Sequence, residues 1–159
     1  MDLSNRAKNI LGFMIFETLL TAYFLWHAYR LPADTPLLSE PMFELVLAIT
    51  IYSIIGGILI SAIVHGTKKA ETADERDKNI EAKADGYAYR TLVWSIGFFL
   101  VFLYASQGVG IPDSPYQIKT ILLSFSFTPL RVLGAMIFIL WVSETVKYAV
   151  QLRLYRQGY

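Results

Sequence analysis

The chain has 159 residues, of which 55% are apolar and 17% are charged, and its mean hydropathy is +0.45. Soluble domains carry about 25% charged residues, so this composition indicates a chain that lies in a lipid bilayer. The formal net charge of +1 gives no electrostatic basis for binding nucleic acid, and the lack of cysteine excludes disulfides, thiolate metal sites and thiol catalysis.

Four stretches of the chain are long and apolar enough to be transmembrane helices. Such a helix needs about 20 apolar residues, because every backbone polar group in the hydrocarbon has to be paired within the helix. The first stretch is too long for a signal-peptide core and no Ala-x-Ala-like site follows it, so we expect it to be retained as a span. The predicted spans are residues 10–29, 45–64, 92–111 and 129–150.

The start of the fourth span carries helix-capping signals. Thr128 is placed to cap a helix, and Pro129 would occupy the first helical position, where a missing N–H costs nothing. The preceding segment, residues 117–127, either lies along the membrane interface or forms the upper part of a proline-kinked helix. We favour the interface.

The basic residues predict how the chain is threaded. The N-terminus, the loop of residues 66–91 and the C-terminal end together hold 11 of the 14 Lys and Arg residues. Loops on the cytoplasmic side are enriched in these residues. We therefore predict an all-α, multi-pass protein of the cell (inner) membrane, with a single membrane domain over residues 1–159, four transmembrane helices and both termini in the cytoplasm.

Small residues recur at every fourth position of the second span. Such a stripe lets another helix backbone approach closely. It serves either packing within the chain or a face for a homodimer. The stripe consists of Ser53, Gly57 and Ser61, with Gly56 beside it.

The loop between the second and third spans contains an extended polar segment, in which we expect a helix over residues 72–90. Thr72 followed by Glu75 has the spacing of a capping box, which would start this helix and let it run into the third span. Its apolar side chains form a narrow strip of Ile80, Ala84 and Tyr87.

Charged residues of the same helix separate onto different faces. An acidic stripe lies on one face, and basic residues recur at every seventh position on another. The helix is either a solvated extension of the third span or a surface for a partner. The basic face holds Arg76, Lys83 and Arg90. The predicted interaction surface consists of Asp74, Glu75, Arg76, Asp77, Glu81 and Asp85.

This loop also carries a resemblance. The run Asp74-Glu75-Arg76, followed by Ile80 and Ala84 and leading into a transmembrane helix, resembles a motif in a family of small four-span membrane proteins of bacteria and archaea. That family has no assigned activity and is often encoded near helix-turn-helix regulators. The resemblance implies a small prokaryotic membrane protein with a regulatory role, and it supplies no catalytic residue.

Ionisable residues inside the bilayer are costly, and each is therefore a hypothesis about function. Glu17 and Glu144 are expected at similar depth in the first and fourth spans. Together with Thr21 and Lys147 they form a candidate polar site that would share a proton or bind a cation. The alternative is that Glu17 bonds to Thr21 while Glu144 pairs with Lys147.

At the opposite end of the spans we expect an ion pair between Arg131 and Glu44, with Asp113 as another possible partner. His27 and His65 lie at opposite ends of their spans, nearly the full hydrocarbon thickness apart, so they cannot ligate one haem. We expect neither a metal nor a cofactor.

The functional prediction follows from what the sequence contains. We find no GxSxG, HExxH, Walker or dinucleotide-binding motif, so we expect no enzyme. We predict an interaction or regulatory protein of the membrane that binds a second copy of itself or another membrane or cytoplasmic protein. The alternatives are an oligomeric channel or carrier for protons or small cations that uses the intramembrane carboxylates, and a lipid- or pigment-binding subunit.

Overall fold

The computed structural model describes residues 5–32, 34–65, 74–106 and 128–157. Within these residues the chain is all-α, as predicted, and each of its four helices is long and apolar enough to cross a membrane. Every helix extends past the apolar stretch that predicts it, because hydropathy does not detect the polar turns at a helix end. The helices are α1 (Asn5–Arg30), α2 (Glu40–His65), α3 (Glu75–Ser106) and α5 (Pro129–Arg156).

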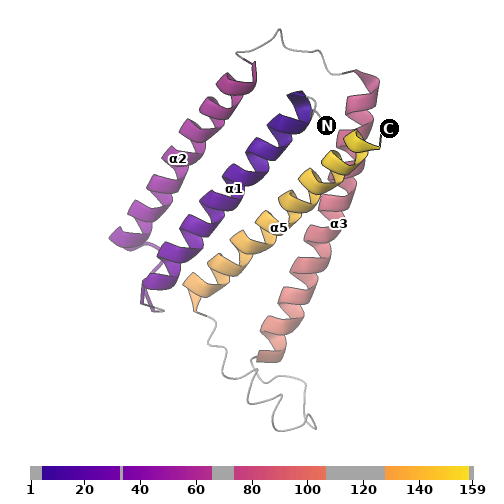
Figure 1. The fold of residues 1–159 in the computed structure, drawn as a ribbon. Coiled ribbons are helices and arrows are strands. Elements are labelled where there is room, and N and C mark those ends of the chain that lie inside the picture. Colours follow the sequence, from indigo (N-terminus) through magenta and orange to yellow (C-terminus); the bar gives the residue numbers. More distant parts are fainter. Residues whose placement is uncertain (1–4, 33, 66–73, 107–127, 158–159) are drawn as a thin grey trace.

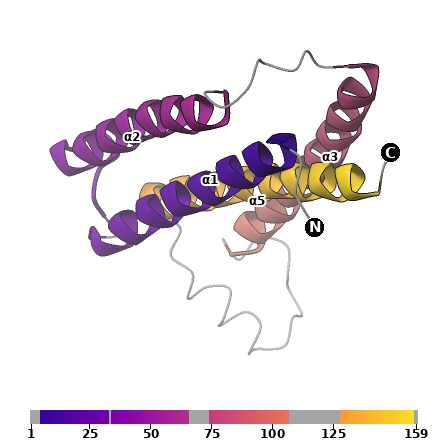
Figure 2. The ribbon, with the colours of Figure 1, turned by 45° about the horizontal axis from the view of Figure 1, so that its top comes forward.

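The helices are arranged in a row, in the order α2, α1, α5, α3 (Figure 1). The helix α1 packs against α2 and α5, α5 packs against α1 and α3, and α2 and α3 do not pack against each other. Figure 2 shows that α3 crosses α5. Along the length of the helices, the beginning of α1 and the end of α5 lie at the same end of the molecule as the end of α2 and the beginning of α3 (Figure 1). We call this the terminal end, and the other the distal end.

The helix α3 begins with a capping box, but not the predicted one. Asp74 precedes the first helical residue, and its Oδ1 accepts a hydrogen bond from the Asp77 N–H at 2.8 Å. Asp77 Oδ2 accepts in return from the Asp74 N–H at 3.1 Å. The prediction of Thr72 as the cap is wrong, because the helix begins at Glu75, and Thr72 itself lies outside the described residues.

From this cap α3 runs without a break into its apolar part, as predicted. The polar turns of α3 pack against α5 instead of being surrounded by solvent. Ile80 and Ala84 are fully buried and Ala88 is nearly so, whereas Tyr87 is 55% exposed. The predicted apolar strip is therefore confirmed for its first two residues and wrong for Tyr87, because the side that faces α5 continues through Ala88.

The helix α5 begins as predicted. Thr128 has an extended backbone, and its hydroxyl accepts a hydrogen bond from the Arg131 N–H at 3.4 Å. Pro129 is the first helical residue. The segment of residues 117–127, which we expected at the interface, lies outside the described residues, as do residues 107–111 at the end of the predicted third span.

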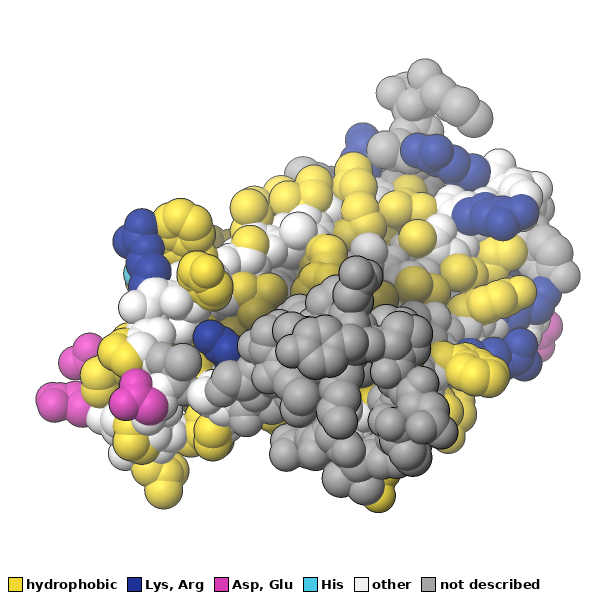
Figure 3. All heavy atoms as spheres, turned by 90° about the horizontal axis from the view of Figure 1, so that it is seen from below, with side chains coloured by type: hydrophobic (Ala, Val, Ile, Leu, Met, Phe, Trp, Pro, Cys, Tyr) yellow, Lys and Arg dark blue, Asp and Glu magenta, His cyan; other side chains and the backbone are white. Residues whose placement is uncertain are grey.

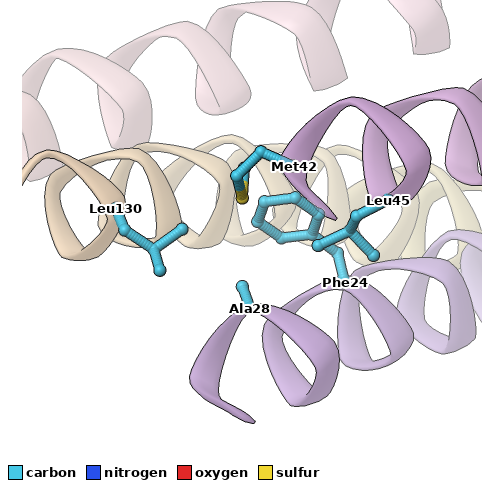
Figure 4. Close-up of a cluster of buried hydrophobic side chains, with 5 residues drawn as sticks. All are labelled: Phe24, Ala28, Met42, Leu45 and Leu130. Carbon is cyan, nitrogen blue, oxygen red and sulfur yellow. The ribbon is translucent and has the colours of Figure 1, made fainter. Parts of the chain in front are cut away.

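The best-buried apolar cluster lies near the distal end, where α1, α2 and α5 meet (Figure 4). Outside this cluster, most large apolar side chains of the four helices are at least partly exposed. Figure 3 shows apolar side chains over much of the visible surface, with charged side chains gathered toward the ends. Such a surface is expected for helices solvated by lipid. The cluster consists of Phe24, Ala28, Met42, Leu45 and Leu130.

Candidate functional site

Three aromatic side chains of α5 tie it to the neighbouring helices through hydrogen bonds. They are spaced by seven residues, so they lie along one side of the helix. Each donates its polar hydrogen to an oxygen of α1 or α3, which pairs groups that would be costly to leave unpaired. The bonds run from Trp141 Nε1 to Thr18 Oγ1 at 3.1 Å, from Tyr148 Oη to Glu17 Oε1 at 2.7 Å, and from Tyr155 Oη to Asp77 Oδ1 at 2.9 Å.

The candidate site around Glu17 differs from both sequence interpretations. Glu17 lies half-buried between α1 and α5, and its hydrogen bond joins Tyr148 rather than Thr21. Glu144 is exposed, and its charge acts on Glu17. The hydrogen bond of Glu17 is therefore with a tyrosine of α5, and the predicted site of Glu17 with Glu144 stays a prediction.

Lys147 also has a partner that the sequence did not suggest. Its Nζ lies 2.8 Å from Asp85 Oδ1 of α3. The Lys147 side chain is 24% exposed and that of Asp85 is 52% exposed, so solvent partly screens this ion pair. The close ion pair of Lys147 is thus with Asp85 of α3 rather than with Glu144 of its own helix, whose charge also acts on Lys147.

The hydrogen bond between Glu17 and Tyr148 makes a measurable prediction. A double-mutant cycle of Glu17→Ala and Tyr148→Phe, each of which removes the hydrogen bond, should give a coupling free energy of about 0.6–1.7 kcal/mol, the range found for polar pairs between membrane helices. The measurement is the free energy of unfolding in mild detergent. Glu144→Gln, which changes an exposed carboxylate, should alter it by less than about 0.5 kcal/mol. A coupling of zero would contradict the contact.

Asp77 joins three elements at the terminal end. Besides capping α3, it forms an ion pair with Arg6 of α1 and accepts the Tyr155 hydrogen bond from α5. The side chains of Asp77 and Arg6 are only 14% and 26% exposed. We call Arg6, Asp77 and Tyr155 the terminal junction.

Much of the predicted interaction surface is thus used within the chain. Asp74 and Asp77 cap α3, Asp77 completes the terminal junction, and Asp85 pairs with Lys147. Glu75, Arg76 and Glu81 are exposed and remain available to another molecule.

The contact of α3 with α5 has a buried polar component. Ser143 Oγ donates to the backbone carbonyl of Ala88 at 2.9 Å, and Ser143 is only 5% exposed. Gln151, two turns further on, is 9% exposed. With Lys147 these residues follow at intervals of four along α5, which is the side that covers the polar turns of α3.

The small-residue stripe of α2 divides between two roles. A Cβ added to Gly56 would overlap the ring of Phe16, so this glycine is required for the packing of α2 on α1. A Cβ added to Gly57 would meet nothing within 4 Å. Ser53 is exposed and Ser61 is half-buried. Gly56 therefore serves packing within the chain, whereas Ser53 and Gly57 stay candidates for a homodimer face.

The predicted ion pair between Arg131 and Glu44 stays a prediction. Both residues are exposed near the distal end, on α5 and α2. The ion pairs found between helices lie at the other end of the molecule, at Arg6 with Asp77 and at Lys147 with Asp85. Within the described ranges, no group of three or more His, Asp or Glu residues is placed to hold a metal ion.

Comparisons of the chain with protein-family models, curated proteins and solved structures gave no match. The resemblance carried by Asp74-Glu75-Arg76 is therefore neither supported nor contradicted, and it stays a prediction. In the structure this run caps and begins α3, so its first residue has a local structural role.

Sequence reasoning missed the aromatic donors of α5 and the role of Arg6. The signal for the donors was present, because Trp141, Tyr148 and Tyr155 are spaced by seven residues and all three can donate a hydrogen bond. Aromatic residues near the end of a span are, however, also typical of the interfacial aromatic belt, so the pattern alone does not indicate hydrogen bonds between helices. For Arg6 the sequence carries no signal, since its partner lies 71 positions away on another helix.

Proposed function

We propose that the chain is a small integral membrane protein, with both termini in the cytoplasm, that acts by binding rather than by catalysis and whose first partner is a second copy of itself. Its location would be the cell (inner) membrane. The observation that carries this proposal is the position of α2 at the edge of the row, where α1 is the only described helix that it packs against.

The uncovered side of α2 has the features of a helix-packing face. Gly57 leaves open space where a side chain would stand, and Ser53 is exposed one turn before it. In lipid, helices associate through close backbone approach, which small residues allow. The neighbouring side chains Ile54 and Ile58 are 59% and 63% exposed and would flank the contact.

Binding of a cytoplasmic partner to α3 is best tested at exposed residues that form none of the described ion pairs. Reversing the charge of Asp77 would break the terminal junction, so it is not a clean test of partner binding. Glu75 and Glu81 are exposed, and their reversal leaves the described ion pairs in place.

The test of self-association uses two glycines that the monomer does not need. Gly57→Leu adds bulk to the proposed contact, and overpacking costs about 1–3 kcal/mol, so we expect dimer affinity to fall by about 10- to 100-fold. The measurement is energy transfer between labelled copies in vesicles at several protein-to-lipid ratios.

Gly97 of α3 is the matched control, because its Cβ would also meet nothing within 4 Å. Gly97→Leu should leave the affinity unchanged. Equal affinities for wild type and Gly57→Leu, or an equal loss in both variants, would refute the proposed face.

Transport of protons or small cations remains the second hypothesis, and the geometry favours it less. The carboxylate of Glu17 lies between α1 and α5 and bonds to Tyr148, while Glu144, whose charge acts on it, is exposed. Toward the distal end the same two helices meet through Phe24, Leu25 and Leu130, which are apolar. A polar path along this contact would have to cross them.

A further inference from the structure

The helices α3 and α5 enclose two hollows of different chemistry. The first, of about 490 Å³, lies in the polar turns of α3 and is lined by Lys83, Tyr87 and Arg90, with Leu154 of α5. The second, of about 600 Å³, lies in the apolar part. Its lining is almost entirely apolar and includes Trp94, Phe98 and Phe102 of α3 with Ala135, Phe138 and Val142 of α5.

The two hollows follow one another along the same side of α3. Lys83, Tyr87, Arg90, Trp94 and Phe98 are separated by four, three, four and four residues, a spacing that keeps side chains on one helix face. From the middle of the first hollow to the middle of the second is about 18 Å along the helix, at 1.5 Å per residue. A ligand with a polar head and a long apolar tail has matching dimensions.

The first hollow has the charge of an anion site. The acidic residues of α3 that form contacts turn toward the other helices, where Asp77 meets Arg6 and Tyr155, and Asp85 meets Lys147. Lys83 and Arg90 line the hollow and bring positive charge to this face of α3. Gly86, also in the lining, has no atom within 4 Å of an added Cβ and leaves room beside these cations.

Its level along α3 matches the headgroup region. Arg90 is the last charged residue before residues 91–106, which contain none. In a membrane this transition lies at the interface, where Arg, Lys and Tyr side chains reach phosphates. Basic pockets at this level between transmembrane helices bind anionic lipid headgroups.

We propose that this side of α3 and α5 is a binding site for one anionic glycerophospholipid. The phosphate lies between Lys83 and Arg90, with the Tyr87 hydroxyl as a further donor, and one acyl chain lies in the apolar hollow against Trp94 and Phe98. The charge of the first hollow and the apolar lining of the second together select this occupant over a soluble anion. The site is independent of the proposed self-association through α2.

Trp94 makes the site measurable. The full chain, as the double variant Trp26→Phe and Trp141→Phe, keeps Trp94 as its single tryptophan. It is reconstituted in phosphatidylcholine vesicles that contain a small fraction of lipid with brominated acyl chains, which quench tryptophan fluorescence at short range. Brominated phosphatidylglycerol should quench more than brominated phosphatidylcholine at the same fraction. Each basic residue at an anionic surface changes lipid partitioning by about fivefold, so Lys83→Gln with Arg90→Gln should reduce this preference at least fivefold.

A control with the same change in charge is Lys8→Gln with Arg156→Gln, both exposed residues at the terminal end outside the hollow. It should keep the preference. Filling the apolar hollow by Ala135→Phe should reduce quenching by both lipids. Inorganic phosphate should not compete.

Four results would overturn the proposal. The first is equal quenching of the wild type by both lipids, and the second is an equal loss of preference in the control pair. The third is competition by inorganic phosphate alone, which would show a site for a free anion. The fourth is quenching that disappears as the protein-to-lipid ratio rises, which would place a second copy of the chain in the hollow.

Discussion

Replacing Asp77 by alanine should destabilise the protein by about 2–4 kcal/mol, because one substitution removes a helix cap, a partly buried ion pair and a hydrogen bond from another helix. The three contacts are those with Asp74, Arg6 and Tyr155. The free energy of unfolding in mild detergent measures the change. A protein of ordinary stability would lose a large fraction of its total.

The adjacent residue Glu75 provides the control. It is an exposed carboxylate at the first position of α3, so Glu75→Gln should change stability by less than about 0.5 kcal/mol. Asp77→Asn should lie between the two, because its amide oxygen can still accept from Tyr155 while the charge that pairs with Arg6 is gone. An alanine variant as stable as wild type would show that the terminal junction contributes nothing.

Enlarging Gly56 should separate α1 from α2. A valine at this position places its Cβ in overlap with the outer edge of the Phe16 ring, and overpacking of this kind costs about 1–3 kcal/mol. We expect a loss near the upper end of this range, because the ring lies between two helices. Thermal unfolding in detergent reports the loss.

A second substitution tests the cause. Phe16→Ala removes the ring, so it should restore part of the stability of Gly56→Val, although it destabilises the wild type by itself. Gly97→Val, at a position with open space, should be nearly neutral. If Gly56→Val and Gly97→Val unfold at the same temperature, the contact between Gly56 and Phe16 does not limit the packing.

The sequence predicts the helices well and their contacts poorly. Long apolar runs and the signals at Thr128 and Pro129 are local features, and the structure confirms the helices and this cap. The observed capping box of α3 lies two residues after the predicted one. The sequence offers both, because Asp74 with Asp77 has the same three-residue spacing as Thr72 with Glu75. Local spacing alone does not choose between them.

The partners of charged residues depend on which helix sides face each other, and a single sequence does not contain this information. Lys147 has a carboxylate three residues away in Glu144, yet it pairs with Asp85 of another helix. Glu17 stands out in the sequence as a carboxylate inside a predicted span, but nothing in the sequence indicates Tyr148 as its partner. The order of the helices in the row decides both outcomes.

That order also constrains how the molecule is assembled during synthesis. The hairpin of α1 and α2 is complete as soon as its second arm leaves the ribosome, because these helices pack on each other. The helix α3 follows, but among the described helices it packs on α5, and it is linked to the finished hairpin by the ion pair of Asp77 with Arg6. Until the last helix emerges, Asp85 lacks Lys147 and the Ala88 carbonyl lacks Ser143. A chain truncated before α5 would therefore contain α3 without the helix that it packs on. We expect quality-control proteases to degrade such a chain.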